Sequence, residues 1–262
     1  MREKNELSVV GVIHLPALPG APRCTAPFPQ ILERALRDAE ALVNGGLETC
    51  IVENLGDVPF RRGRVSPHVP AMLAVIGTEL SNRWGEDLKI GINVLRNDGH
   101  SAIGAATACR AQFVRINVLT GSAWTDQGLI EGEAASLLRY RESLGSNVQI
   151  MADVCVKHAV PAGDSNIVRV AVDTVERGGA DGVIVTGDGT GLPTRMSDLT
   201  AVRSALPNHP VWVGSGVTPE SISEIQQNAD GVIVGTYLHQ GGDLRAPIDE
   251  ARVRSIVSAL RS

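Results

Sequence analysis

The sequence predicts a single (β/α)8 (TIM) barrel, and three observations support this fold class. Short apolar, β-branched runs alternate with segments of helical spacing, eight of each along the chain. Such alternation implies parallel strands with right-handed crossovers, and eight units favour a closed barrel over an open sheet. The length of 262 residues suits one barrel, so residues 1–262 are expected to form one domain. No Gly-x-Gly-x-x-Gly turn follows the first strand, which argues against a dinucleotide-binding sheet.

The expected strands are short apolar runs that end at glycines or polar residues, as strands buried on both faces do. They cover residues 9–14, 49–54, 89–95, 113–118, 148–154, 182–186, 211–213 and 231–234. The expected helices cover residues 31–43, 71–80, 101–110, 130–144, 168–177, 199–206 and 248–260, and one more begins after Gly216. Polar residues 120–127 are expected to be a loop, and the loop over residues 56–69 carries Arg61, Arg62 and Arg64.

The turns after the last two strands predict a phosphate site. Thr218 can cap the helix that follows the first turn, Pro219 fits its first position, and Glu220 favours its positive end. Backbone N–H groups beside a helix N-terminus bind anions, and barrels commonly hold a phosphate after strands seven and eight. The residues expected to bind it are Gly214, Ser215, Gly216, Gly235 and Thr236. The alternative is a pair of tight strand–helix turns without a ligand.

Polar residues occupy the carboxyl ends of the expected strands, which face one pocket in such a barrel. They are His14, Glu53, Asn93, Arg115, Asn117, Asp153, Thr186 and Asp188. Val114, Ile116 and Val118 share one parity and are expected to face the helices, which turns Arg115 and Asn117 into the barrel. A buried arginine needs a partner, and Asp153 on the next strand is the expected one. The alternative is an Arg–Asp pair that only closes the barrel.

Several of these residues suit acid–base chemistry. Asp153 is the first choice as general acid or base, and Lys157 and His158 follow it closely. Each of those two alone is also an ordinary loop residue. Glu53 and His14 are neighbours in strand order and suit a base and its orienting partner, although His14 also fits a histidine at the edge of the core.

A second glycine-rich turn, residues 186–191, carries Thr186, Asp188 and Thr190, which suit a substrate or an anion. The alternative is a tight loop held by its own side chains. No cofactor is predicted. A divalent metal on Glu53, His14 and Asp153 is a minority option, because no motif with metal-ligand spacing is present.

Composition limits the partners. The net charge is −5, which argues against nucleic acid as the main partner. No apolar run is long enough for membrane insertion. The four cysteines form no Cys-x-x-Cys pair and are expected to be buried, reduced thiols of a cytoplasmic protein. A phosphorylated small molecule is the expected ligand, and a homo-oligomer, most simply a dimer, is the expected assembly.

Four stretches resemble the BtpA family. They are VIHLPALPGAP (residues 12–22), VEN (52–54), DVCVKHA (153–159) and TGDGTG (186–191). The family is also named for photosystem I biogenesis, and some of its members, of the SgcQ type, are labelled nucleosidases. The resemblance implies a barrel like those that bind ribulose phosphate. It carries over no catalytic residues.

Two functions follow as hypotheses. The first is an enzyme that acts on a phosphorylated sugar or nucleoside, as a nucleosidase or as a phosphosugar isomerase or lyase, by carboxylate acid–base catalysis. The second is a non-catalytic assembly factor for a membrane complex such as photosystem I, which the family name implies. The ring of polar strand ends favours the enzyme, since an assembly factor has no need of it. The arginine-rich loop is compatible with both.

Overall fold

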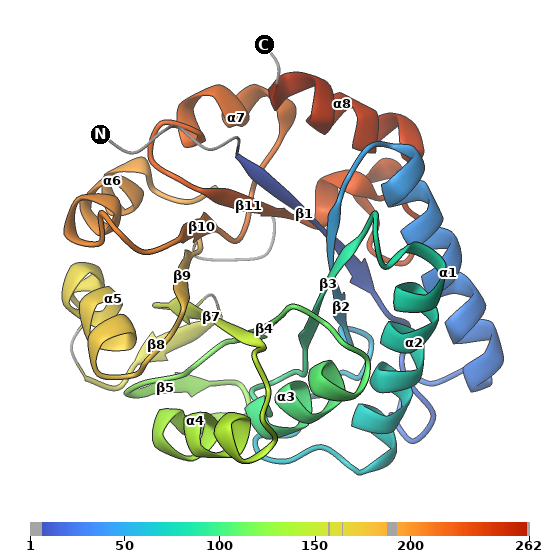
Figure 1. Ribbon diagram of the computed structural model, residues 1–262, viewed down its shortest axis with the longest axis horizontal. Helices are drawn as coiled ribbons and strands as arrows, with labels where there is room; N and C mark the ends of the chain where they lie inside the picture. The colour runs from blue at the N-terminus through green and yellow to red at the C-terminus, as the bar shows by residue number, and fades with distance from the viewer. Residues whose placement is uncertain (1–6, 157, 164, 188–192, 261–262) are drawn as a thin grey trace.

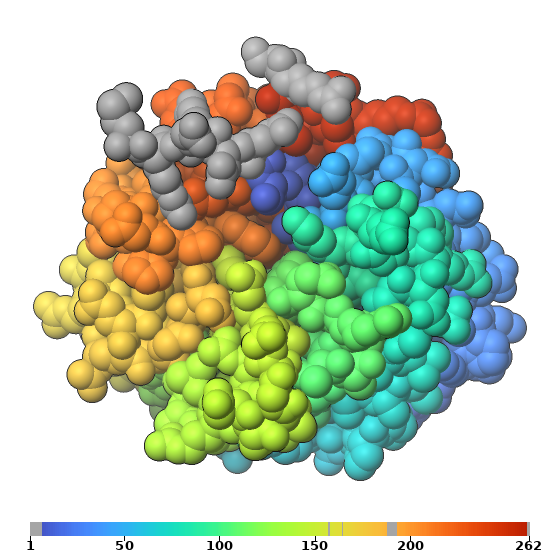
Figure 2. All heavy atoms as spheres, in the orientation of Figure 1, coloured from blue at the N-terminus to red at the C-terminus, as the bar shows by residue number. Residues whose placement is uncertain are grey.

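The computed structural model describes residues 7–156, 158–163, 165–187 and 193–260. Within these residues, parallel strands close a barrel in the order β1, β11, β10, β9, β7, β4, β3, β2, so the expected barrel is confirmed. Figure 1 shows the helices as an outer ring around this barrel, and in Figure 2 the colours succeed one another around the molecule, as consecutive β/α units do.

The expected strands and helices are found with boundaries shifted by a few residues, apart from the segment discussed below. The barrel strands are β1 (Ser8–His14), β2 (Thr49–Glu53), β3 (Lys89–Asn93), β4 (Phe113–Ile116), β7 (Gln149–Val154), β9 (Gly182–Val185), β10 (Val211–Val213) and β11 (Gly231–Val234). The helices are α1 (Phe28–Asn44), α2 (His68–Trp84), α3 (Gly99–Ala108), α4 (Ala134–Ser143), α5 (Ile167–Glu176), α6 (Met196–Ala205), α7 (Pro219–Ile225) and α8 (Glu250–Leu260). Two 3-10 turns, η1 (Thr236–Leu238) and η2 (Gln240–Gly242), separate β11 from α8.

Alternation along the strands divides the apolar side chains into two cores. One set packs inside the barrel and consists of Val10, Val12, Ile51, Phe113, Met151, Ile184 and Ile233, with Trp212 against them. The other set fills the layer between strands and helices. Phe113 and Trp212 meet edge to face, with ring centroids 5.4 Å apart. These large rings fill the barrel interior, so the side chains that bind a ligand must lie above them, at the carboxyl ends of the strands.

One expectation was wrong. The segment expected to be a polar loop contains β5 (Ser122–Thr125), which pairs with β6 (Gly128–Glu131) and β8 (Ala159–Pro161) in an antiparallel sheet. The expected helix over residues 130–144 therefore begins only at Ala134. The physical reason is a tight turn at Asp126 and Gln127, which lets β-branched and aromatic residues on its two sides pair. This small sheet packs on the barrel through Val118, Ala123, Ile130 and Val156.

None of the helices in the described part of the chain has the length and hydrophobicity needed to cross a bilayer.

Candidate functional site

Strand register brings the predicted polar residues to one level at the carboxyl end of the barrel. His14 lies opposite Glu53, and Glu53 lies opposite Asn93. Glu53 and Asn93 are 7% and 1% exposed, so this end of the barrel is a buried polar layer. Such a layer is stable only if its members bind one another or a ligand.

Arg115 and Asp153 form the expected ion pair. The Arg115 Nε and Nη2 atoms donate to the two Asp153 carboxylate oxygens at 3.0 and 2.9 Å, and Asn117 Nδ2 donates to Asp153 Oδ2 at 2.7 Å. Burial by itself lowers the pKa of Arg115, but the charge and hydrogen bonds of Asp153 outweigh it, so the pKa is raised. Three donors occupy the Asp153 carboxylate.

Glu53 keeps one oxygen turned toward His14. Its Oε2 accepts a hydrogen bond from Asn93 Nδ2 at 2.6 Å, whereas its Oε1 lies 3.9 Å from His14 Nε2. The carboxylate is thus oriented by an amide on one side and faces an imidazole on the other. This arrangement fits the base and orienting partner expected from the sequence.

A second histidine, His239 in the segment after β11, determines which His14 nitrogen carries a proton. His239 Nδ1 lies 2.7 Å from the carbonyl oxygen of Ala246, which can only accept, so this nitrogen is the donor. Burial lowers the pKa of His239, which favours its neutral form and leaves Nε2 as an acceptor. His14 Nδ1 lies 3.1 Å from that Nε2 and therefore donates to it. His14 Nε2 is then the nitrogen that faces Glu53.

The lowered pKa of His239 predicts a pH dependence of stability. The unfolded chain binds the proton near pH 6.5, whereas in the folded chain burial, opposed by the Ala246 hydrogen bond and by Asp38, keeps the pKa lower. The unfolded state therefore binds more protons as the pH falls below 6.5, and the free energy of unfolding decreases. Urea unfolding at pH 7.5 and 5.5 should show a larger loss for the wild type than for His239→Gln. Equal losses in the two proteins would contradict the neutral, buried His239.

The predicted phosphate residues surround a cavity of about 280 Å³ that also contains His14, Glu53 and Arg115. Outside the helices and strand ladders, no backbone hydrogen bond in the described residues uses the N–H of Gly216, Gly235 or Thr236. All five residues predicted to bind phosphate line this cavity, and so do Glu53 and His14.

Two glycines have a further role in this cavity, which is to make space. A Cβ at Gly235 would lie 2.8 Å from His14 Cε1, and a Cβ at Gly214 would lie 3.4 Å from Arg115 Nη2. The absent side chain of Gly235 lets His14 approach β11. At Gly214 the closer neighbours are Ile184 Cγ2 and Thr186 Cγ2, each 2.6 Å from such a Cβ, so this glycine mainly makes room for β9 and the turn after it. Ser215 differs from the expectation in one respect, because its hydroxyl accepts a hydrogen bond from the Gly187 N–H at 2.8 Å and so joins the turn after β10 to the turn after β9.

The helix after Gly216 begins as expected. Thr218 is the residue before α7, Pro219 is its first residue, and Glu220 lies in its first turn. The Ser221 hydroxyl accepts a hydrogen bond from the Thr218 N–H at 3.0 Å, which fixes the chain at the helix start. Thr218 itself lines the cavity.

Sequence reasoning missed two arginines at the site. Arg96 is 6% exposed, and although burial lowers its pKa, the charges of Asp153 and Glu53 act on it in the opposite direction. Arg252 of α8 lines the cavity, donates to the Tyr237 carbonyl at 2.7 Å and lies 4.9 Å from the centre of the Tyr237 ring. Extending the search a few residues past each strand end would have found Arg96. No strand-end signal exists for Arg252, which comes from a helix.

The remaining predicted residues are distributed as follows. Lys157, Asp188 and Thr190 lie outside the described residues. His158 is exposed and does not line the cavity. Thr186 packs its methyl group at Gly214, and its buried hydroxyl has no hydrogen-bond partner within the described part of the chain.

The arginine-rich loop is partly engaged with its own surroundings. Arg61 donates to Ser66 at 2.8 Å, and Arg64 lies 3.6 Å from Asp98. In the described residues, no three His, Cys, Asp or Glu side chains gather as metal ligands would. Cys50 and Cys109 are buried as expected, whereas Cys24 and Cys155 are only half-buried.

These features define a (β/α)8 barrel with a cavity of about 280 Å³ at the carboxyl ends of its strands. The BtpA family profile matches residues 5–262, and the chain belongs to that family. It is 45% identical over 252 residues to the photosystem I biogenesis protein BtpA of Synechocystis sp., an alignment that covers 96% of this chain and 87% of that one.

Solved structures share the barrel. A structure of KGPDC from Streptococcus mutans, solved as a complex, is 10% identical, with a TM-score of 0.62 and coverage of 98% of both chains. The N-(5'-phosphoribosyl)anthranilate isomerase of Pyrococcus furiosus is 12% identical, with a TM-score of 0.60 and coverage of 97% of this chain and 98% of that one. At this level of identity the likeness establishes the fold alone.

Proposed function

We propose that this protein is an enzyme that acts on a phosphorylated sugar or nucleoside. The observation that carries the proposal is a single cavity, about 280 Å³ in volume, lined by the glycine-rich turns on one side and by His14 and Glu53 on the other. Backbone N–H groups and the N-terminus of a helix favour an anion on the first side. An imidazole and a carboxylate provide proton transfer on the second.

The phosphate lies on the backbone around Ser215, Gly216, Gly235 and Thr236, and Arg252 adds a positive charge at the rim. The reacting carbon then lies toward Glu53 and His14. For cleavage of an N-glycosidic bond, His14 protonated on both nitrogens gives its Nε2 proton to the leaving base while Glu53 stabilises the cationic sugar carbon. Water then adds to that carbon and returns a proton to His14 Nε2, which completes a hydrolysis. For isomerisation, Glu53 moves a proton next to a carbonyl group.

Asp153 has a different role in this proposal from the one that the sequence suggested first. Its oxygens accept two hydrogen bonds from Arg115 and one from Asn117. Both oxygens of this carboxylate are thus occupied by donors from the protein itself. Asp153 therefore orients Arg115, whose Nη2 lies next to Gly214 at the edge of the phosphate site.

The proposal is tested by a screen of phosphorylated sugars and nucleosides, read as the rise in melting temperature that a bound ligand causes. Ligands that stabilise the protein are then incubated with it and followed by phosphorus NMR for conversion. The proposal fails if no phosphorylated compound raises the melting temperature at concentrations up to the millimolar range.

Gly216→Asp is expected to abolish that stabilisation, because a carboxylate would occupy the position of the phosphate. Gly145→Asp is the matched control, since Gly216 and Gly145 have φ of +68° and +59° and a Cβ at Gly145 meets nothing within 4 Å. Both variants place an aspartate at a similar positive φ and add the same charge. If Gly216→Asp were stabilised by ribose 5-phosphate as much as Gly145→Asp, the phosphate would bind elsewhere.

A second candidate function is that of an assembly factor, as the name of the Synechocystis relative suggests. One observation favours it: Trp124 on β5 and Val160 on β8 lie opposite each other and are 56% and 66% exposed. Exposed apolar side chains that adjoin one another commonly mark a contact surface. Such a function does not need the buried ion pairs and the cavity at the strand ends, so it ranks second.

A further inference from the structure

A larger cavity, of about 490 Å³, lies beside the site already described. Figure 1 shows β5 and β8 at the flank of the barrel between α4 and α5, and the cavity is lined by residues from these four elements and from the ends of β4 and β7. Asp153 lines this cavity, and its ion-pair partner Arg115 lines the phosphate cavity. The two cavities therefore lie on either side of the Arg115–Asp153 pair, whose Nη2–Oδ1 distance is 2.9 Å.

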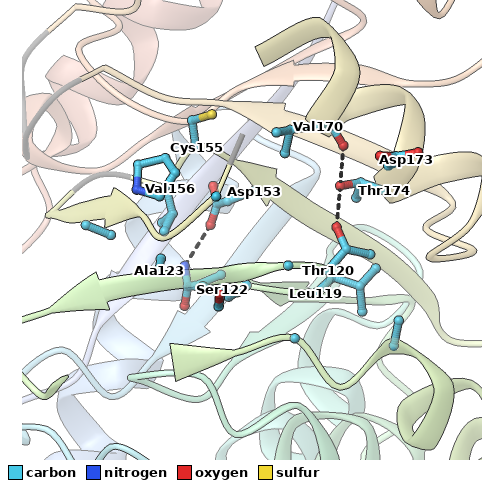
Figure 3. Close-up of a pocket in the computed structure, with 18 of the residues that line it drawn as sticks. Leu119, Thr120, Ser122, Ala123, Asp153, Cys155, Val156, Val170, Asp173 and Thr174 are labelled. Carbon is cyan, nitrogen blue, oxygen red and sulfur yellow. Dashed lines mark hydrogen bonds between the residues drawn. The ribbon is translucent and has the colours of Figure 1, made fainter. Parts of the chain in front are cut away.

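The walls of the larger cavity are mainly apolar and uncharged. Figure 3 shows Asp153 and Cys155 on one side and Thr120 and Thr174 on the other, with Val156 and Val170 among the apolar residues. The hydroxyl groups of Thr120 and Thr174 lie 2.9 Å apart, and Thr174 donates to the Val170 carbonyl, so these hydroxyls are already engaged. Walls of this kind favour an uncharged group with a large apolar surface.

The charged side chains among the described lining residues give no site for a second phosphate. Asp153 is held by Arg115 and Asn117. Asp173 and Arg177 lie 3.9 Å from each other on α5. A phosphate on the substrate is therefore directed to the other cavity, which fixes the orientation of a molecule that occupies both.

Asn117, which lines this cavity, carries a buried acceptor that none of the described residues uses. Its Nδ2 must be the atom that faces Asp153, because a carboxylate oxygen can only accept. Its Oδ1 is therefore turned away from Asp153, and this buried atom has no hydrogen-bond partner among the described residues. Asn117 is 4% exposed and lines the cavity. A buried acceptor without a donor costs free energy. A ligand that donates an N–H or O–H hydrogen bond to this acceptor removes that cost and therefore binds more tightly.

We infer that the cavity between α4 and α5 binds the non-phosphorylated end of the substrate, an uncharged ring-sized group that donates a hydrogen bond to Asn117 Oδ1. The inference rests on the proposed function, because it places the phosphate of the same molecule in the cavity near Gly216. It narrows the substrate class to phosphorylated sugars that carry such a group and makes Asn117 a specificity-determining residue.

The test compares ribose 5-phosphate, which lacks such a group, with four ribonucleoside 5′-monophosphates, which carry one, by calorimetric titration of the full chain. At least one monophosphate is expected to bind roughly ten- to a hundredfold more tightly than ribose 5-phosphate, the gain expected for burying a ring. If ribose 5-phosphate binds and no monophosphate binds better, the inference is wrong and the proposed function stands. If none of the five compounds binds, the inference is likewise wrong, whereas the proposed function is decided by the wider screen of phosphorylated sugars and nucleosides.

Two variants locate the added affinity. Ala135→Trp places a large side chain in the cavity from an exposed position of α4, and Ala71→Trp makes the same change at an exposed position of α2 that does not line it. The quantity compared is the ratio of the affinities for the monophosphate and for ribose 5-phosphate. Ala135→Trp should reduce this ratio at least tenfold, and Ala71→Trp should leave it unchanged. Asn117→Leu should also reduce this ratio, by roughly fivefold or more, because it removes the acceptor. An unchanged ratio in both Ala135→Trp and Asn117→Leu would overturn the inference.

Discussion

Replacing Asp153 with asparagine is expected to lower the free energy of unfolding by about 3–5 kcal/mol, the usual cost of removing one partner of a buried ion pair. Arg115 and Asp153 are 4% and 5% exposed, so water does not replace the lost carboxylate. The amide also brings a donor to a place where Arg115 and Asn117 already donate. In a chain of this size, the loss corresponds to a fall in melting temperature of roughly 6–20 °C.

Two further variants make this measurement specific. Asp243→Asn breaks the exposed pair with Arg245 and should leave the melting temperature nearly unchanged, because exposed pairs contribute little. The double variant Arg115→Met with Asp153→Leu removes both charges and should recover much of the loss, since the remaining Arg115 charge causes most of it. If Asp153→Asn were as stable as the wild type, the ion pair would not hold this end of the barrel. Loss of turnover without loss of stability would then return Asp153 to the role of acid or base.

The Arg115–Asp153 pair illustrates what the sequence could predict. Side chains alternate strictly along a buried strand. Because the apolar Val114 and Ile116 were expected to face the helices, Arg115 between them was predicted to face the barrel interior. The nearest acidic strand end, Asp153, was then the only sensible partner, and the structure confirms both steps. The same argument placed His14, Glu53 and Asn93 at one level.

Other parts of the site depend on the path of the chain after a strand ends. The hydrophobic periodicity of the sequence does not predict that path. His239 reaches His14 because two 3-10 turns follow β11, and Arg252 reaches the cavity from a helix. The sheet of β5, β6 and β8 was hidden because its strands are short and its turn is polar. The larger cavity exists only because that sheet inserts between α4 and α5, so no reading of single strand ends could predict it.

Glu53→Gln is expected to lower turnover by roughly two to four powers of ten, the usual contribution of a general acid or base. Glutamine keeps the shape of the side chain and can still accept from Asn93 Nδ2, which lies 2.6 Å from Glu53 Oε2 in the wild type. It cannot take up a proton or stabilise a positive charge on the substrate. Because the phosphate residues are untouched, ribose 5-phosphate should bind to the variant within a few-fold of its wild-type affinity.

The measurement is the rate of conversion, followed by phosphorus NMR, of the ligand that the screen identifies. Asn93→Ala serves as the comparison, because it removes only the group that orients the carboxylate. It should reduce turnover less than Glu53→Gln, since Glu53 retains its negative charge and its position 3.9 Å from His14 Nε2. A Glu53→Gln protein with wild-type turnover would exclude Glu53 from the chemistry. A Glu53→Gln protein that no longer binds ribose 5-phosphate would instead show that Glu53 shapes the cavity, and the proton transfer would then have to be assigned to other residues.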